Sequence, residues 1–155
     1  MRIKLGILLV LIALVGCAQS SLSVNYNYST EGSFYDVKIE NSNIAYTHLD
    51  FEKIRDKCSG WIQQAPCWDV NDLITEEAQL TSEEIRVLQG LSVEAKQLES
   101  YYGPAKGQRC YPYVLQVDTK EITYCSRPDG PAQPEAFAQL TLNIEEIVTR
   151  TFILS

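Results

Sequence analysis

Alternating apolar and polar residues predict strands in several parts of the chain. Residues 22–28 and 34–40 each follow the two-residue period of a strand, and residues 44–51 form a return strand after a short Asn-containing turn. Residues 110–125 show the same alternation on both sides of a central turn, which is typical of a hairpin. Together these patterns predict about five antiparallel strands.

Two later segments carry the period of a helix. Thr81 and Glu84 have the spacing of a capping box, and apolar residues then recur at steps of three or four as far as Tyr102. The Gly-Pro pair at 103–104 would end this helix, and Gly90 would weaken its middle. The second helix follows Pro134, and its apolar stripe consists of Phe137, Leu140, Ile144, Ile147, Val148 and Thr151.

The order of these elements predicts an α+β fold over residues 22–155, with a small antiparallel sheet and two helices packed on one face. The pattern leaves open which side of the third strand is buried, because Ile44 and Leu49 lie on opposite faces. Residues 53–80 show no clear period. This layout is similar to that of small bacterial inhibitor domains such as the emfourin family of metallopeptidase inhibitors. The resemblance concerns layout alone and assigns no functional residue.

The first residues have a different pattern. Basic residues at Arg2 and Lys4 precede an apolar stretch at 5–15, which is the order of a secretory signal peptide. The stretch is shorter than the roughly 20 residues that span a bilayer. Its end, Leu14-Val15-Gly16-Cys17, resembles the lipobox of bacterial lipoproteins. The resemblance implies removal of residues 1–16 and acylation of Cys17, which with the next four residues (17–21) would form a lipidated tether.

The expected location follows from the same resemblance. In the enterobacterial pattern, a residue other than Asp after the acylated Cys implies the outer membrane, and Ala18 stands there. The short tether favours the periplasmic face, although the sequence leaves surface exposure open. The net charge of −7 becomes −9 once Arg2 and Lys4 are removed, and such a surface repels nucleic acid and anionic headgroups. We therefore expect no nucleic-acid partner and membrane attachment through acyl chains on Cys17 alone.

Four further cysteines remain in the mature chain. An even number in an exported protein predicts two disulfides, and the spacing favours Cys58 with Cys67 and Cys110 with Cys125 among three possible pairings. The second pair lies on one side of the predicted hairpin, as a cross-strand disulfide requires. A zinc site is the alternative, but the chain has no C-x2-C pair and no Cys/His cluster. We predict no metal and no cofactor.

Two sets of residues are candidates for catalysis or metal binding. His48 is the only histidine, so a Ser-His-Asp or Cys-His device would need it, and a half-buried strand histidine is the favoured interpretation. The nearest acid in sequence is Asp50. The acidic run lacks EF-hand spacing, because Ile74 replaces the required Gly and Leu80 the closing Glu. We expect a solvated acidic face. That run comprises Asp69, Asp72, Glu76, Glu77, Glu83 and Glu84.

Aromatic residues favour a binding role. Tyr and Trp anchor protein interfaces because they add large rigid area with a polar tip. Trp61 and Ile62 lie inside the predicted Cys58–Cys67 loop, and Trp68 follows it, so a stapled loop would present them already ordered, although packing over the core is the alternative. We predict a lipid-anchored, non-catalytic binding protein of the cell envelope: an inhibitor, immunity factor or assembly subunit whose partner is an envelope protein. A hydrolase of peptidoglycan or another glycan that uses paired carboxylates is the alternative, and a structural spacer is a third.

Overall fold

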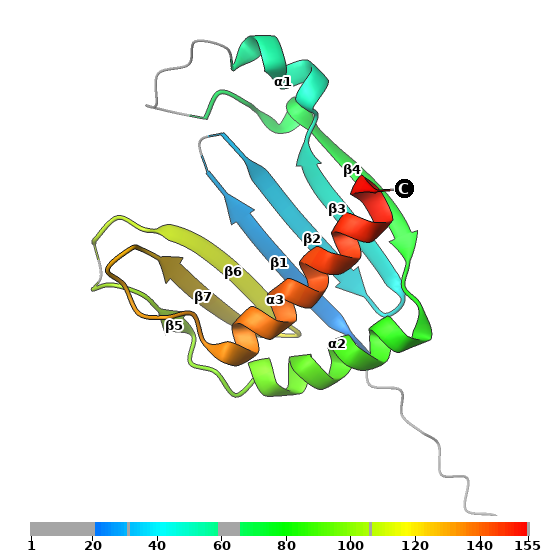
Figure 1. The fold of residues 1–155 in the computed structure, drawn as a ribbon, viewed down its shortest axis with the longest axis vertical. Coiled ribbons are helices and arrows are strands. Elements are labelled where there is room, and N and C mark those ends of the chain that lie inside the picture. The colour runs from blue at the N-terminus through cyan, green and yellow to red at the C-terminus, as the bar shows by residue number, and fades with distance from the viewer. Residues whose placement is uncertain (1–20, 31, 59–65, 106, 155) are drawn as a thin grey trace, which may run out of the picture.

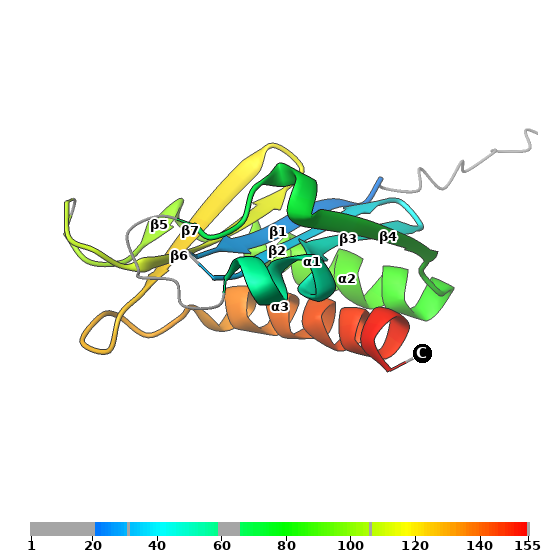
Figure 2. The same ribbon diagram turned by 90° about the horizontal axis from the view of Figure 1, so that it is seen from above.

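The computed structural model describes residues 21–30, 32–58, 66–105 and 107–154. These residues form an α+β fold in which one seven-stranded sheet carries helices α2 and α3 on the same face (Figures 1 and 2). The strands are β1 (Ser23–Ser29), β2 (Phe34–Glu40), β3 (Asn43–Leu49), β4 (Leu73–Gln79), β5 (Tyr101–Tyr102), β6 (Tyr111–Val117) and β7 (Lys120–Ser126). The helices are α1 (Phe51–Lys57), η1 (Val70–Asp72), α2 (Ser82–Ala95), α3 (Glu135–Val148) and η2 (Thr149–Ile153).

The sheet is larger than the sequence predicts, and it is mixed. Its strand order is β4-β3-β2-β1-β6-β7-β5, and every neighbouring pair is antiparallel except the parallel pair β5–β7. The prediction of five antiparallel strands is therefore wrong by two strands. β4 was missed because it is an edge strand with most side chains exposed, so it shows no alternation. β5 has only two residues, too few for a period.

The first long helix ends earlier than predicted. The Thr81–Glu84 capping box is confirmed, but α2 stops at Ala95, whereas the predicted stripe continued to Tyr102. Leu98 and Tyr102 still pack against the core, from the connection and from β5. Because both residues are partly buried, apolar residues still recur at helical spacing beyond Ala95, although the chain there is not helical. Gly90 lies within α2 and does not break it.

The segment after β3 also differs from prediction. The strand ends at Leu49, and α1 begins at Phe51, because the Asp50 side chain accepts hydrogen bonds from the backbone N–H groups of Glu52 and Lys53. The open question of the buried face of β3 is settled: Ile44 and Tyr46 face the helices. Leu49 is buried as well, at the strand end next to α1.

The centre of the core is aliphatic. A set of directly paired side chains crosses five strands on the helix side of the sheet, and we call it the aliphatic row: Ala78, Ile44, Ile39, Val24 and Val117. These residues belong to one cluster with Leu88 of α2 and with the predicted stripe of α3, of which all members but Thr151 are buried. Thr151 lies in η2 and is half-buried. Burial of this apolar area is the main stabilising term of the fold.

The opposite face of the sheet has polar residues. Asn25 donates to Asp36 at 3.0 Å, and the hydroxyls of Thr47 and Thr75 are 2.8 Å apart. An antiparallel sheet with one face in water has this alternation. Within the described ranges, no helix is both long enough and apolar enough to cross a bilayer.

Both predicted disulfides are formed. Cys58 pairs with Cys67 at a Cα–Cα distance of 5.3 Å, and Cys110 pairs with Cys125 at 5.4 Å. Each distance lies within the range that a disulfide requires. The pairing leaves none of these four thiols for the zinc site weighed as the alternative. On the loop-entropy model each bridge contributes about 3 kcal/mol to stability.

Candidate functional site

Six aromatic side chains form a continuous row across the helix side of the sheet, one from each of six neighbouring strands. Each residue is the direct register partner of the next, so all six point to the same face. We call this set the aromatic row, and it consists of His48, Tyr35, Tyr28, Tyr113, Tyr124 and Tyr102. It lies four residues along β1 from the aliphatic row, which is about 13 Å.

The rings of the aromatic row contact one another and a second layer. Tyr28 and Tyr113 are stacked, with ring centroids 4.6 Å apart and an interplanar angle of 14°. Tyr35 lies between Tyr26 and Tyr46, at 5.6 Å and 5.1 Å. These separations are those of favourable aromatic pairs. Several strands therefore contribute to one connected aromatic surface.

Part of this surface is open because α3 crosses the sheet diagonally. Figure 1 shows α3 running from the β6–β7 side toward the β3–β4 side, while the ends of β1 and β2 at their connecting turn lie beside it. A groove of about 480 Å³ occupies this corner. We call it the tyrosine groove. Aromatic rings line one side of it, and residues of α3 and η2 line the other. The aromatic residues are Tyr26, Tyr28, Phe34, Tyr35, Tyr46, Phe51 and Tyr113, and the others are Ser33, Glu145, Val148, Thr149 and Ile153.

A second hollow of about 430 Å³ lies against the first half of α3. It shares Tyr26, Tyr113 and Glu145 with the tyrosine groove, so the two hollows meet at these side chains. Tyr124 of the aromatic row lines it as well. The aromatic surface therefore continues from one side of Glu145 to the other.

Within the described part of the chain, Glu145 is the one charged residue that lines either of these two hollows. It follows the buried Ile144 on α3, and the helical turn brings its carboxylate to the edge of the apolar stripe, toward the sheet. Tyr26 donates a hydrogen bond from its hydroxyl to Glu145 Oε1 at 3.0 Å. No other hydrogen-bond partner of this carboxylate is found among the described residues, so its second oxygen is available.

The tyrosines around Glu145 are held in their neutral form. Burial, followed by the charge of Glu145, raises the pKa of Tyr26 and of Tyr35 far above the ordinary tyrosine value. The Tyr35 hydroxyl is buried, and no hydrogen-bond partner for it exists in the described part of the chain. A buried hydroxyl without a partner is costly, so this group lowers the stability of the fold.

His48 lies at one end of the aromatic row, and its environment is that of a half-buried strand residue. Its Nδ1 is 3.0 Å from the carbonyl oxygen of Leu49, its Nε2 is 3.1 Å from Glu76, and its ring stacks on Tyr46 at 4.5 Å. The acid beside it is therefore Glu76 of β4. Asp50, the nearest acid in sequence, caps α1.

Apart from Glu77, the remaining acidic residues of the run are used in caps and ion pairs. Asp69 and Asp72 form a capping box at η1, and both carboxylates pair with Lys57. Hydrogen bonding to Lys57 holds the pKa of Asp72 below its usual value. Glu83 pairs with Arg86. Among the described residues, no group of three or more acidic, histidine or cysteine side chains is arranged to hold a metal ion.

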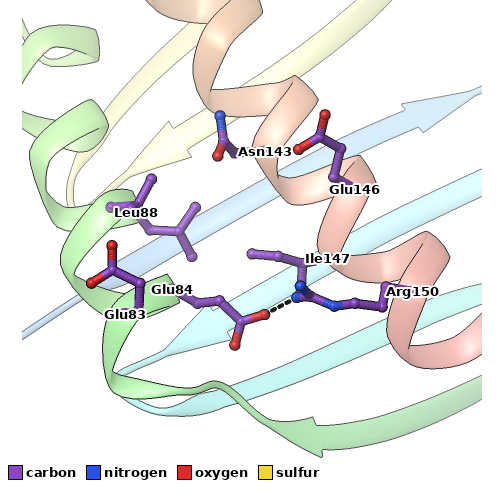
Figure 3. A pocket seen from close by; sticks show the side chains of 8 residues that line it. Glu83, Glu84, Leu88, Asn143, Glu146, Ile147 and Arg150 are labelled. Carbon is purple, nitrogen blue, oxygen red and sulfur yellow. Dashed lines mark hydrogen bonds and ion pairs between the residues drawn. The ribbon is translucent and has the colours of Figure 1, made fainter.

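A third hollow lies between α2 and α3 and was considered as a site (Figure 3). Its volume is only about 130 Å³, and Leu88 and Ile147 form its base. Glu84 reaches across it to Arg150, and the same carboxylate completes the α2 capping box at Thr81. These contacts tie the two helices together, so this hollow is a structural junction.

The predicted binding residues are only partly covered by the structure. Cys17, Trp61 and Ile62 lie outside the described residues. Trp68 is half-buried and packs edge-on against Phe34, with ring centroids 5.4 Å apart. Since Phe34 lines the tyrosine groove, Trp68 is the predicted residue that adjoins it.

The groove itself is not predicted from the sequence. Its tyrosines recur at alternate positions of β1 and at single positions of β2, β3 and β6, which is a visible signal of one face. That they stand side by side depends on the pairing of β1 with β6, which are more than 80 residues apart in the chain. Glu145 carries no sequence signal, because an acidic residue beside an apolar stripe is the ordinary pattern of a surface helix.

Comparisons of the chain with protein-family models, with characterised proteins and with solved structures find no match. We therefore infer function from the chemistry of the groove.

Proposed function

We propose that this chain is a lipid-anchored protein of the cell envelope that binds a protein partner through the tyrosine groove and performs no catalysis. It would act as an inhibitor, an immunity factor or an assembly subunit. The observation that carries the proposal is the open corner of the aromatic row, where Tyr28 and Tyr113 present stacked rings beside α3. Tyrosine-rich, pre-ordered surfaces bind proteins well because little side-chain entropy is lost on association.

The position of the groove on β1 agrees with an anchor at Cys17. β1 begins at Ser23, six residues after Cys17, and its other end reaches the groove at Tyr28. Seven residues of strand extend about 23 Å. In Figure 1 the chain enters β1 at one end of the sheet, and the β1–β2 turn lies at the opposite end. An anchored domain would thus present its groove away from the bilayer, to a partner in the aqueous space of the envelope.

The groove also bears on the alternative of glycan hydrolysis. Glycosidases use two carboxyl groups placed about 5–9.5 Å apart across the bound sugar. Of the described carboxylates, a single one lines the tyrosine groove and the adjoining hollow, that of Glu145. This arrangement favours binding over two-carboxylate hydrolysis at this site. Incubation of the purified full-length protein with sacculi tests the alternative, and release of soluble fragments would establish it.

The proposal is tested by crosslinking the full-length protein in its native membranes without reductant and identifying attached proteins by mass spectrometry. One stoichiometric protein partner is expected, and Tyr28→Leu should reduce its yield at least tenfold. Tyr101→Leu is the matched control, since Tyr101 is exposed on the opposite face of the sheet. Recovery of no partner, or equal loss with both variants, contradicts binding through the groove.

The anchor has its own test. Cells fed an alkyne-labelled fatty acid should label the wild-type protein and leave Cys17→Ser unlabelled. The variant should also move from the membrane fraction to the soluble fraction. Unchanged fractionation of Cys17→Ser would remove the lipid anchor from the proposal and leave the binding role standing.

A further inference from the structure

The charge of the tyrosine groove indicates the sign of the charge on its ligand. Among the described residues, Glu145 is the one charged side chain that lines the groove, and no described Lys or Arg lines it. The chain as a whole carries 20 acidic and 13 basic residues. Both the local and the overall field therefore attract a cation and repel an anion.

An unused hydrogen-bond acceptor in the groove further restricts the chemical class of the ligand. One oxygen of Glu145 accepts the hydrogen bond of Tyr26, and the other accepts none from the described residues. A carboxylate oxygen can accept further hydrogen bonds. A guanidinium group offers five N–H donors in a planar fork that matches a carboxylate and can stack on rings at the same time, whereas a lysine offers a single compact charge.

The walls of the groove suit a planar cation. Tyr28, Tyr35 and Tyr113 are half-buried and line the same groove as Glu145, and Tyr28 and Tyr113 are already stacked on each other. Arginine stacks on aromatic faces more readily than lysine does, and the attraction is about 0.5–2 kcal/mol, larger where water is excluded. The aliphatic stem of the arginine would lie against Val148 and Ile153 on the α3 side.

We propose that the tyrosine groove binds a basic peptide segment of the partner protein, and that an arginine of this segment pairs with Glu145 between the tyrosine rings. This inference rests on the proposed function and deepens it by naming the chemistry of the occupant. A neutral glycan stacked on the rings, or a second copy of this chain, would be a different occupant and is distinguished by the experiment.

The experiment selects the ligand without assuming its sequence. A random 12-residue peptide library is displayed on phage and panned against the full-length protein purified in non-ionic detergent. Selected peptides are then synthesised, and their dissociation constants are measured by calorimetry against the wild type, Glu145→Gln and Glu146→Gln. Glu146 is the matched control, because it removes the same charge from the next residue of α3 but lines the hollow between the helices.

The inference predicts that selected peptides contain arginine and that Glu145→Gln weakens their binding at least tenfold, while Glu146→Gln changes it less than twofold. Replacing the peptide arginine by citrulline, which keeps the shape and removes the charge, should also weaken binding at least tenfold. Replacement by lysine should weaken it severalfold. Binding should decline as salt is raised.

Several results would overturn it. Selection of acidic or uncharged peptides, failure to select any peptide, or equal binding by wild type and Glu145→Gln each contradict an arginine at this position. If crosslinking in membranes nevertheless recovers a stoichiometric partner, the proposed function stands and this inference alone fails. Saturable binding of soluble muropeptides to the wild type, lost in Tyr28→Leu, would replace the basic peptide with a glycan. Self-association that Glu145→Gln abolishes would replace it with a second copy of the chain.

Discussion

The aliphatic row and the aromatic row cross the same face of the same sheet, yet they differ in what covers them. Four members of the aliphatic row are at most 2% exposed, and they belong to one cluster with residues of α2 and α3. Most members of the aromatic row are only half-buried, and part of that row lines the open groove. A short distance along the strands thus separates a packed interior from an accessible surface.

The difference shows how one strand can serve both stability and recognition. In β1, Val24 is fully buried while Tyr28 lines the groove, although both point to the same side. Branched aliphatic side chains fill an interior closely. Tyrosine tolerates partial exposure because its ring packs and its hydroxyl meets water or a ligand. The two rows therefore make different predictions when their members are replaced.

The largest effect on stability is expected in the aliphatic row. Ile39→Ala removes a fully buried side chain and leaves a cavity, which should lower the free energy of unfolding by about 3 kcal/mol. Urea unfolding followed by circular dichroism measures this loss. Tyr28→Leu is the comparison variant, and its loss should be about 1 kcal/mol. Equal losses would show that the two rows do not differ as described.

A smaller change of opposite sign is expected at Tyr35. Its buried hydroxyl has no described partner, so Tyr35→Phe removes an unsatisfied group and should raise the free energy of unfolding by about 1 kcal/mol. The same variant should leave binding of the selected arginine peptides within twofold of the wild type, because the hydroxyl is buried beneath the groove surface. Urea unfolding and calorimetry on the same preparations give both numbers. A destabilised variant with weakened affinity would contradict both halves of this prediction.

Much of the fold could be predicted because its signals are local. The hairpins, the capping box at Thr81, the stripe of α3 and both disulfides depend on short spacings. The missed elements lack such signals: β4 is exposed on most of its length, and α1 depends on a single cap at Asp50. In each of these places tertiary contacts decide the structure.

The site was harder to predict than the fold. Tyr26 and Tyr28 stand at alternate positions of β1, but the alignment of Tyr28 with Tyr113 requires the pairing of strands far apart in the chain. Trp61 and Ile62 are more conspicuous in the sequence, because two nearby cysteines enclose them in a predicted loop. Register between distant strands is set by the complete core, so no short window of sequence contains it.

A pH titration of the protein reports on the tyrosines of the aromatic surface and not on the aliphatic row, since the aliphatic row has no ionisable group. The pKa of Tyr26 and Tyr35 is raised in the folded state, first by burial and then by the charge of Glu145. Their contribution is fully present below the unfolded tyrosine pKa of about 10 and is lost as pH rises toward the folded value. Unfolding free energy should therefore fall above about pH 10.

The variant Glu145→Gln sharpens this test. Removing the charge should move the pKa of Tyr26 and Tyr35 downward, which absorbance of tyrosinate would detect, while Glu146→Gln should leave the titration unchanged. If every tyrosine of the wild type titrates near its ordinary value without unfolding, the aromatic row is more open to water than described.

The smallest effect is expected at the end of the aromatic row, at His48. His48→Phe keeps a ring that can stack on Tyr46 and removes the hydrogen-bond contact of Nε2 with Glu76, whose side chain is 46% exposed. A polar contact so open to solvent contributes little, so the free energy of unfolding should change by about 0.5 kcal/mol or less. Binding of the selected peptides should also be unchanged, because His48 does not line the tyrosine groove. A large loss of any activity found with sacculi would instead indicate that His48 takes part in catalysis, and the aromatic row would then end in a reactive group.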